Sequence, residues 1–283
     1  MAVLRDVLHE AHQLLADANK GRTPYLDALL IASHVLQMPK ERTLAMLPDH
    51  ISKTQEQEIR ELVLYRSRGI PVAYLTGVKE FWGLEFLVTP DVLIPRPDTE
   101  VLVERSLMLL KRFSSPRVLD LGTGSGCIGI SIKHELPQAQ VICSDISSRA
   151  LAVCRKNARR ILGSEEMVEI ISSDMFEEIP GLFDLIVSNP PYITREEMTS
   201  ESLLCRGEPE NALLGGEDGL DALKKIVFQG FDKLKENSYC ICECATVQAD
   251  TLAGIMQQRG YRHISVISDL SGNARAVLGA RDG

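Results

Sequence analysis

The sequence has few of the features that mark membrane, secreted or nucleic-acid-binding proteins. It contains no run of about 18 apolar residues, the length needed to span a bilayer, and charged residues soon follow Met1, which disfavours a signal peptide. Its 31 Lys and Arg residues are outnumbered by 39 Asp and Glu, and the formal net charge of -8 weighs against broad contact with nucleic-acid phosphates. We therefore predict a cytoplasmic protein that binds neither a membrane nor nucleic acid directly.

Metal-binding cysteine patterns are also lacking. The seven cysteines are an odd number, and none has the C-x2-C spacing typical of zinc sites. Cys240, Cys242 and Cys244 alternate, so in a strand they would share one face. A metal or redox cluster is one interpretation, and small apolar side chains in a reducing cytosol is the favoured one. We predict no metal cofactor.

Residues 1–75 have the pattern of a small helical bundle. Apolar residues from Val3 to Leu15, including Leu14, recur at three- and four-residue steps and form one stripe. Thr23-Pro24 is typical of a helix start, and Thr54 with Gln57 resembles a capping box. No strand pattern interrupts this region. The bundle is interpreted either as a structural cap or as a recognition domain for a partner.

Residues 76–97 form a linker in which aromatic and β-branched residues alternate with Gly77, Gly83 and Pro90, a pattern that predicts a β-hairpin. Residues 98–283 then alternate between helix and strand patterns, beginning with a helix that follows Pro95. Such alternation indicates an α/β domain with a doubly wound, mainly parallel sheet, in which ligands bind at the carboxyl ends of the strands. The predicted strands are 117–121, 139–144, 168–172, 183–188, 238–244, 261–267 and 274–279.

A glycine loop joins the first of these strands to a helix. Gly122, Gly124 and Gly126 allow a tight turn and close approach of a ligand, in a pattern that fits both dinucleotides and S-adenosylmethionine. Asp145, at the end of the next strand, suits the ribose hydroxyls of either ligand. Asp120 adds negative charge that favours a cationic sulfonium over a pyrophosphate, the alternative being a charge at a helix N-terminus.

The most informative stretch is Asn189-Pro-Pro-Tyr192, directly after a strand of buried type. Two prolines remove two backbone donors and stiffen the turn, which sheet stability does not require. The Asn189 side-chain oxygen and the Pro190 carbonyl can accept the two hydrogens of a planar amino group, and Tyr192 can stack on its plane. This arrangement predicts methyl transfer to an amide-type nitrogen without a strong general base.

The same motif is shared by methyltransferases that act on adenine N6, cytosine N4 and glutamine N5. Nearly end to end, the chain resembles the bacterial release factor glutamine N5-methyltransferase family, through Ile94–Glu100, Leu119–Ile128, Glu208–Leu220 and Asp269–Arg275. The resemblance implies a seven-stranded Rossmann-like class I methyltransferase fold for residues 98–283, with the helical domain contacting class 1 peptide chain release factors. The implied substrate is the glutamine of their Gly-Gly-Gln loop.

The resemblance also implies the site residues. Asn189, Pro190, Pro191 and Tyr192 would hold the glutamine, with Asn189, Pro190 and Tyr192 as the catalytic set. The cofactor would be S-adenosylmethionine, leaving as S-adenosylhomocysteine, and we expect a monomer. The cofactor would contact Asp120, Gly122, Thr123, Gly124, Ser125, Gly126, Asp145, Met175 and Asn189.

Other functions remain open from sequence alone. Methylation of a ribosomal protein glutamine would use the same residues, and N6-adenine methylation would use the same motif but also needs a basic groove and base extrusion. A dehydrogenase fits the glycine loop alone, and a non-catalytic adaptor fits poorly with an intact Asn189-Pro-Pro-Tyr192.

Overall fold

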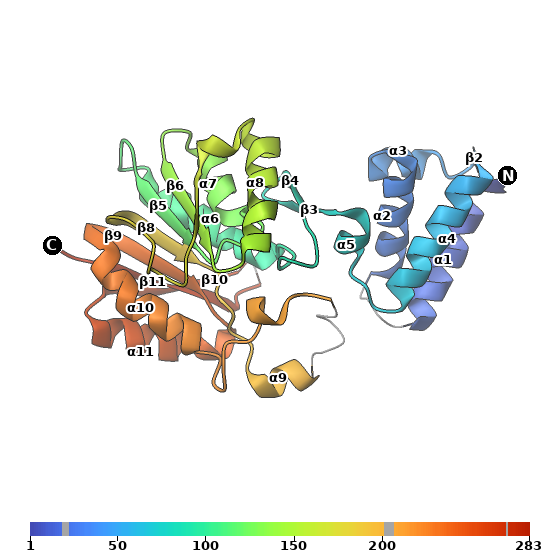
Figure 1. Ribbon diagram of the computed structural model, residues 1–283. Coiled ribbons are helices and arrows are strands. Elements are labelled where there is room, and N and C mark those ends of the chain that lie inside the picture. The colour runs from blue at the N-terminus through green and yellow to red at the C-terminus, as the bar shows by residue number, and fades with distance from the viewer. Residues whose placement is uncertain (19–22, 201–206, 270) are drawn as a thin grey trace. The chain divides into compact units, whose positions relative to one another are not determined.

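The computed structural model describes residues 1–18, 23–200, 207–269 and 271–283. The chain divides into a helical unit, which contains Met1–Val78, and a larger α/β unit, which contains Lys79–Thr199 and Glu208–Gly283 (Figure 1). Among the described residues, no helix has the length and apolar character needed to cross a bilayer.

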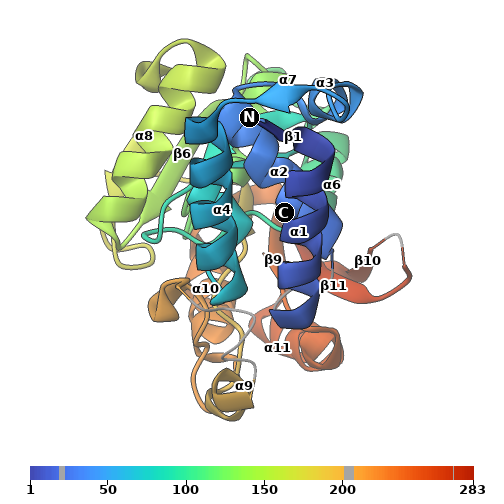
Figure 2. The ribbon, with the colours of Figure 1, turned by 90° about the vertical axis from the view of Figure 1, so that its right-hand side faces the viewer.

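The helical unit is held together by one apolar core. The helix α1 lies beside α2 and α4 (Figure 2). Its Leu4, Val7, Leu8 and Leu15 are buried in the core of this unit. Leu14, predicted to join this stripe, is instead 43% exposed, because its position in the helical repeat turns it away from the packed face. The helices of this unit are α1 (Leu4–Ala18), α2 (Pro24–Leu36), α3 (Lys40–Ala45), α4 (Lys53–Ser67) and α5 (Val72–Thr76).

The predicted capping box at Thr54 and Gln57 is wrong. The box lies two residues earlier, where Ser52 Oγ accepts from the Gln55 amide at 3.2 Å and Gln55 Oε1 accepts from the Ser52 amide at 3.0 Å. Both pairs have the same spacing, and the helix begins at Lys53, so only the first pair stands at the helix terminus.

Two further details of this unit differ from the sequence prediction. Pro24 does begin α2, but the Thr23 side chain caps no backbone amide. A short antiparallel pair, β1 (Ala2–Val3) with β2 (His50–Ile51), interrupts the helical pattern. Strands of two residues are too short to produce a readable alternation, which is why the sequence did not reveal them.

The α/β unit contains, within the described residues, a seven-stranded sheet of order β10-β11-β9-β8-β5-β6-β7. β11 is antiparallel to both neighbours, and the other pairs are parallel. The predicted doubly wound fold is therefore confirmed, and every predicted strand is present. The strands are β5 (Arg117–Leu121), β6 (Gln140–Asp145), β7 (Glu169–Ser172), β8 (Phe183–Ser188), β9 (Leu234–Glu243), β10 (Arg262–Ser268) and β11 (Ala274–Arg281).

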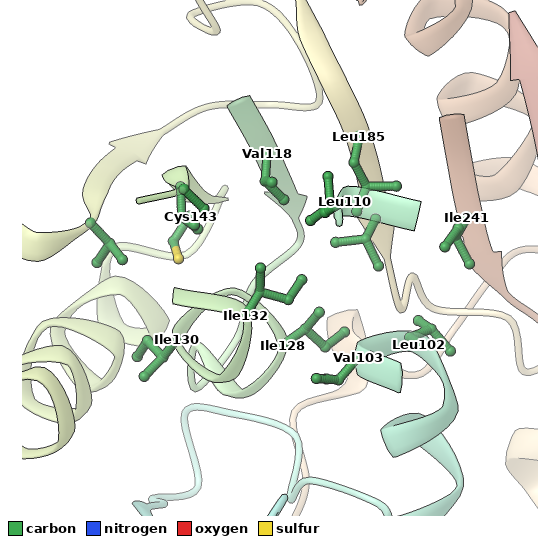
Figure 3. Close-up of a cluster of buried hydrophobic side chains, with 14 of the residues drawn as sticks. Leu102, Val103, Leu110, Val118, Ile128, Ile130, Ile132, Cys143, Leu185 and Ile241 are labelled. Atoms are coloured by element: carbon green, nitrogen blue, oxygen red, sulfur yellow. The ribbon is translucent and has the colours of Figure 1, made fainter. Parts of the chain in front are cut away.

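Helices cover both faces of this sheet. Val118 on β5 packs toward α6 (Glu100–Leu110) and α7 (Cys127–Glu135), as Figure 3 shows for the side chains of this core. Leu119, the next residue, packs on the opposite face toward α10 (Asp221–Lys233) and α11 (Ala249–Arg259). Alternate residues of one strand therefore pack into two separate cores. Because both faces of the strand are buried, apolar residues such as Val118 and Leu119 follow one another without a polar residue between them.

The predicted hairpin consists of β3 (Val78–Phe81) and β4 (Leu84–Leu87). Trp82 and Gly83 form its two-residue turn with φ of 55° and 67°, the left-handed geometry that matches the twist of paired strands. Cys240 and Cys242 on β9 and Cys244 directly after it share the core beneath α10 and α11 and are buried, with 3.7 Å between the Cys240 and Cys242 sulfurs. Among the described residues, no group of three metal-ligating side chains is placed to hold a metal ion.

One buried amide joins the hairpin to the glycine loop. Asn157, fully buried on α8 (Ser148–Leu162), accepts from the Leu87 amide at 2.7 Å and donates to the carbonyls of Leu87 (3.0 Å) and Ser125 (2.9 Å). Both ends of the amide are therefore used, which fixes its orientation.

We expect Asn157→Ala to lower the free energy of unfolding by about 2 kcal/mol, because one buried and two part-buried backbone groups lose their partner. Urea denaturation followed by circular dichroism measures the effect. Lys156→Ala, an exposed neighbour on the same helix, is the control. Equal midpoints for the two variants would contradict the structural role of Asn157.

Candidate active site

The site residues lie in one row along the carboxyl edge of the sheet. Parallel pairing places Leu121 opposite both Ser144 and Ser188, and Ser188 opposite Cys242. The residues that follow these positions are Asp145, Gly122, Asn189 and Glu243, which therefore emerge side by side. The first three were predicted, and Glu243 was not.

Asp120, near the end of β5, holds the glycine loop and the start of α7 through hydrogen bonds. Its Oδ2 accepts from the Thr123 hydroxyl at 2.5 Å and from the Gly129 amide at 2.8 Å. Gly129 lies in the first turn of α7, so Asp120 serves the helix N-terminus, which was the alternative interpretation of its charge. Burial raises the pKa of Asp120 to about 6. Its Oδ1 is buried and, among the residues that the structure describes, has no hydrogen-bond partner.

Asp145 fixes the loop from the neighbouring strand. Its Oδ2 accepts from the Gly124 amide and its Oδ1 from the Ser147 amide, both at 2.9 Å. Burial raises the pKa of this carboxyl, whereas the backbone donors oppose that change. Each carboxylate oxygen keeps a second lone pair, so the predicted acceptance of ribose hydroxyls is compatible with this geometry.

Met175 belongs to a turn anchored on the same strand end. The Ser173 amide donates to the Asp145 carbonyl, and the Ser173 hydroxyl donates to the Met175 carbonyl, each at 3.1 Å. Met175 has φ of 49°, packs partly against the core beneath α10 and α11, and stays half-buried. Its predicted contact with an adenine ring remains a prediction.

Asn189-Pro-Pro-Tyr192 leaves β8 with all peptide bonds trans. Asn189 Nδ2 donates to Thr99 Oγ1 at 3.2 Å, which leaves Oδ1 as the remaining acceptor of that side chain. The Tyr192 hydroxyl donates to Glu243 Oε1 at 3.2 Å, and the Tyr192 carbonyl accepts from Gln248 Nε2 at 3.0 Å. The motif is thus held by hydrogen bonds at both ends.

Part of the segment Glu208–Leu220 packs against the backbone of the Asn189-Pro-Pro-Tyr192 motif. A Cβ at Gly215 would lie 2.7 Å from the Pro191 carbonyl oxygen, and one at Gly219 would lie 2.3 Å from that of Tyr192. The Ile193 amide donates to the Leu213 carbonyl at 2.9 Å, in the manner of a short strand pair. Only glycine permits this approach, so part of the segment Glu208–Leu220 supports the prolines directly.

Two site residues escaped the sequence analysis. Thr99, 1% exposed, ends the short helix η1 (Pro97–Thr99), and Glu243, 2% exposed, ends β9. Glu243 could have been found by the reasoning applied to Asp145, since both are acids at the carboxyl end of a parallel strand. Thr99 has no local pattern, because its partner Asn189 lies 90 positions away.

The loop residues fit a polar ligand with hydrogen-bond donors. Besides Asp120 Oδ1, the Ser125 hydroxyl is buried and has no well-aligned partner within the described part of the chain. Unpaired buried polar atoms of this kind are costly in a folded protein and commonly mark a ligand site. A ligand with an amino group and hydroxyls, such as S-adenosylmethionine, carries donors of the required kind.

Comparison with known proteins identifies the family and the fold. Residues 98–206 match the family described as methyltransferase small domain, and residues 6–77 match the PrmC N-terminal domain. Among solved structures, a methyltransferase from Pyrococcus furiosus is similar in fold (TM-score 0.53, 18% identity, 79% of this chain and 98% of that one). The catalytic domain of hMettl16 bound to an RNA hairpin is also similar in fold (TM-score 0.57, 13% identity, 78% and 82%). The fold and the family match define a methyltransferase.

Curated relatives specify the family further. The chain is 42% identical to the release factor glutamine methyltransferase of Bordetella pertussis, over 93% of this chain and 96% of that one. It is 39% identical to the protein of the same name from Borreliella burgdorferi, over 91% and 90%. The chain belongs to the release factor glutamine methyltransferase family.

We expect Asp145→Asn to weaken binding of S-adenosylhomocysteine about 10- to 100-fold, because the introduced NH2 group opposes a backbone N–H donor and removes a charged acceptor. Calorimetric titration measures the dissociation constant. Glu169→Gln, the same chemical change at an exposed position where β7 begins, is the control. Unchanged affinity in Asp145→Asn would remove Asp145 from the cofactor site.

Proposed function

We propose that this chain transfers the methyl group of S-adenosylmethionine to the side-chain amide nitrogen of the Gly-Gly-Gln glutamine in class 1 peptide chain release factors. The observation that carries the proposal is the state of Asn189, whose Nδ2 is engaged by Thr99 while its Oδ1 is left as an acceptor beside the proline turn. An acceptor at that place is what the NH2 group of a glutamine requires. The family relationship supports the choice of substrate.

The residues of the motif make a poor nucleophile reactive by orienting it. An amide nitrogen shares its lone pair with the carbonyl group, so it attacks only when it becomes pyramidal. Asn189 Oδ1 and the Pro190 carbonyl accept its two hydrogens, which raises electron density on nitrogen and directs the lone pair out of the plane. Tyr192, fixed by Glu243, covers the amide face and excludes water.

The bound cofactor supplies an electrophilic methyl group and a thioether leaving group. The nitrogen lone pair, oriented by Asn189 and Pro190, would take up this methyl group, and the electron pair of the broken S–C bond would stay on sulfur. The extra proton on nitrogen is then lost to solvent, so the motif needs no strong base. Asp120 and Asp145 contribute negative charge on the side of the glycine loop, which suits a cationic sulfonium.

A labelling experiment tests the proposal directly. The chain is incubated with methyl-labelled S-adenosylmethionine and a purified class 1 release factor, beside a factor with the glutamine changed to alanine, a ribosomal protein fraction and RNA. Label on the unmodified factor alone, mapped to that glutamine by mass spectrometry, is the expected result. Label on the ribosomal protein fraction or on RNA would reassign the substrate to that class, and label on the alanine variant would place the modified residue elsewhere in the release factor.

We expect Asn189→Ala to lower kcat by on the order of 10²-fold or more while the affinity for S-adenosylhomocysteine stays within a factor of about two, since orientation of the amide is lost and the loop is untouched. Single-turnover kinetics and calorimetry separate these quantities. A large loss of cofactor affinity with an unchanged rate of methyl transfer would contradict the role assigned to Asn189.

The helical unit is proposed to recognise the release factor. Its surface carries large apolar side chains, among them Leu26 (42% exposed) on α2 and Leu64 (44%) with Tyr65 (38%) on α4. Exposed apolar and aromatic residues are the usual anchors of a protein interface, whereas the catalytic motif contacts only one side chain of the substrate.

We expect Leu64→Asp to raise KM for the intact release factor about tenfold, equivalent to about 1.4 kcal/mol of binding, because a charge replaces an interface anchor. Steady-state kinetics with each variant measure KM. Glu58→Ala, an exposed polar position on the same helix, is the control, and cofactor affinity is the internal standard. Identical KM values for the two variants would place this part of α4 outside the interface.

A further inference from the structure

Thr99 lies between Asn189 and Glu243, and all three are drawn from different parts of the α/β unit. Asn189 Nδ2 donates to Thr99 Oγ1 at 3.2 Å. The Thr99 hydroxyl lies close enough to the Glu243 carboxyl to lower its pKa. Glu243 Oε1 accepts from the Tyr192 hydroxyl at 3.2 Å. Oε2 is buried and, among the described residues, has no well-aligned donor, so the adjacent Thr99 hydroxyl is the donor that can satisfy it. A single buried carboxylate is thus connected to both polar side chains of the motif.

The direction of these hydrogen bonds follows from the chemistry of the groups. An ionised carboxylate only accepts, so the single hydrogen of the Thr99 hydroxyl must point to Glu243. The hydroxyl oxygen is then left as an acceptor, and the Asn189 group that satisfies it is the NH2 end of the amide. The amide oxygen of Asn189 is therefore the end left for the substrate.

The orientation of the Asn189 amide has to be fixed by hydrogen bonds, because the oxygen and NH2 ends of an asparagine amide have nearly the same shape. In the opposite orientation, the Asn189 NH2 group would oppose the NH2 group of the substrate glutamine, donor against donor. Packing alone does not distinguish these orientations, and a hydrogen bond of fixed direction does.

We propose that Glu243 is a positioning residue that sets the orientation of the Asn189 amide through Thr99 and fixes the Tyr192 ring directly. The inference rests on the proposed function, since it assigns an origin to the acceptor that the substrate amide requires. Glu243 itself contacts neither substrate nor cofactor in this scheme.

The substitution Glu243→Gln tests the proposal directly. Glutamine has nearly the same shape as glutamate, but its NH2 group donates to Thr99 where the carboxylate accepts. The oxygen of the introduced glutamine can still accept from Tyr192, and its NH2 group then donates to Thr99 Oγ1. The Thr99 hydrogen is turned toward Asn189, whose amide must present its oxygen there. The NH2 end of Asn189 is thereby left for the substrate.

The ionisation of Glu243 provides a second, independent consequence. Burial raises its pKa to about 7, and protonation would supply a donor where the scheme requires an acceptor. We therefore expect kcat to rise as the pH increases through about 7. The titratable and charged groups that act on Glu243 from the surrounding elements are Asp98 on η1, Cys127 on α7, Tyr192 after β8, Cys244 after β9 and Arg275 on β11.

The experiment compares Glu243→Gln, Thr99→Val and Thr99→Ser with the unmodified chain, using S-adenosylmethionine and a class 1 release factor. We expect Glu243→Gln and Thr99→Val to lower kcat on the order of 10²-fold with KM for both substrates within about threefold. Thr99→Ser should restore most of the activity lost in Thr99→Val, because it restores the hydroxyl. Glu236→Gln, an exposed position on the same strand, is the matched control.

A thermal melt at pH 8 separates positioning from a merely structural role. The pKa of Glu243 is about 7 in the folded chain against 4.5 ordinarily, so the folded state binds the extra proton between these values. Stability linked to Glu243 is therefore highest below pH 4.5, falls as the pH rises to about 7, and is level above. Glu243→Gln removes a buried charge, and its Tm at pH 8 should equal or exceed that of the unmodified chain.

The possible outcomes distinguish this inference from the proposed function. An unmodified chain that does not label the release factor would refute the proposed function. If that chain is active but Glu243→Gln keeps its kcat, or loses activity together with Tm, or keeps the rise in kcat near pH 7, the positioning role is overturned. A lower kcat, an undiminished Tm and a flat pH profile would support it.

Discussion

The parallel register of β6, β5, β8 and β9 is the constraint on which the whole site depends. It places Ser144, Leu121, Ser188 and Cys242 level with one another, so that the residues after them meet at one edge. Side chains alternate between the two faces of a strand, and a slip of one residue would move Asn189 to the opposite face and bury a polar side chain in a core. The apolar cores on both faces exclude that slip, so packing far from the edge determines the geometry of the chemistry.

The same edge concentrates negative charge in a buried place. The pKa values of Asp120, Asp145 and Glu243 are all raised by burial, so each ionised carboxylate lowers the stability of the fold. Backbone N–H groups offset this for Asp120 and Asp145, and Arg275 does so in part for Glu243. A destabilising buried carboxylate is retained where its charge orients neighbouring groups. An uncharged side chain would be easier to bury, but it would not fix the direction of the hydrogen bonds that its neighbours make.

The sequence predicted the elements of this edge better than the connections between them. The strands and the glycine loop follow from local patterns, although β9 begins at Leu234, before its predicted start at residue 238. Asn189 was proposed because a stiff proline turn after a buried strand has no structural need. Thr99 was missed because its hydrogen-bond partner lies 90 positions away. Glu243 could have been found in the way Asp145 was, as an acid at the carboxyl end of a parallel strand, although its hydrogen-bond partner lies 51 positions away. The capping box was misplaced by two residues, since equivalent polar pairs precede the helix and only the backbone distinguishes them.

Selectivity requires more than the motif can provide. Two acceptors and an aromatic ring suit any planar amino group, so Asn189-Pro-Pro-Tyr192 alone would accept an exposed adenine as readily as a glutamine. An extended nucleic acid, however, is disfavoured by a net charge of -8. Discrimination between one glutamine and all others must then come from contacts beyond the amide, where binding energy from remote surfaces brings a particular side chain to the turn. Under the proposed function, the exposed apolar residues of α2 and α4 would provide such a surface.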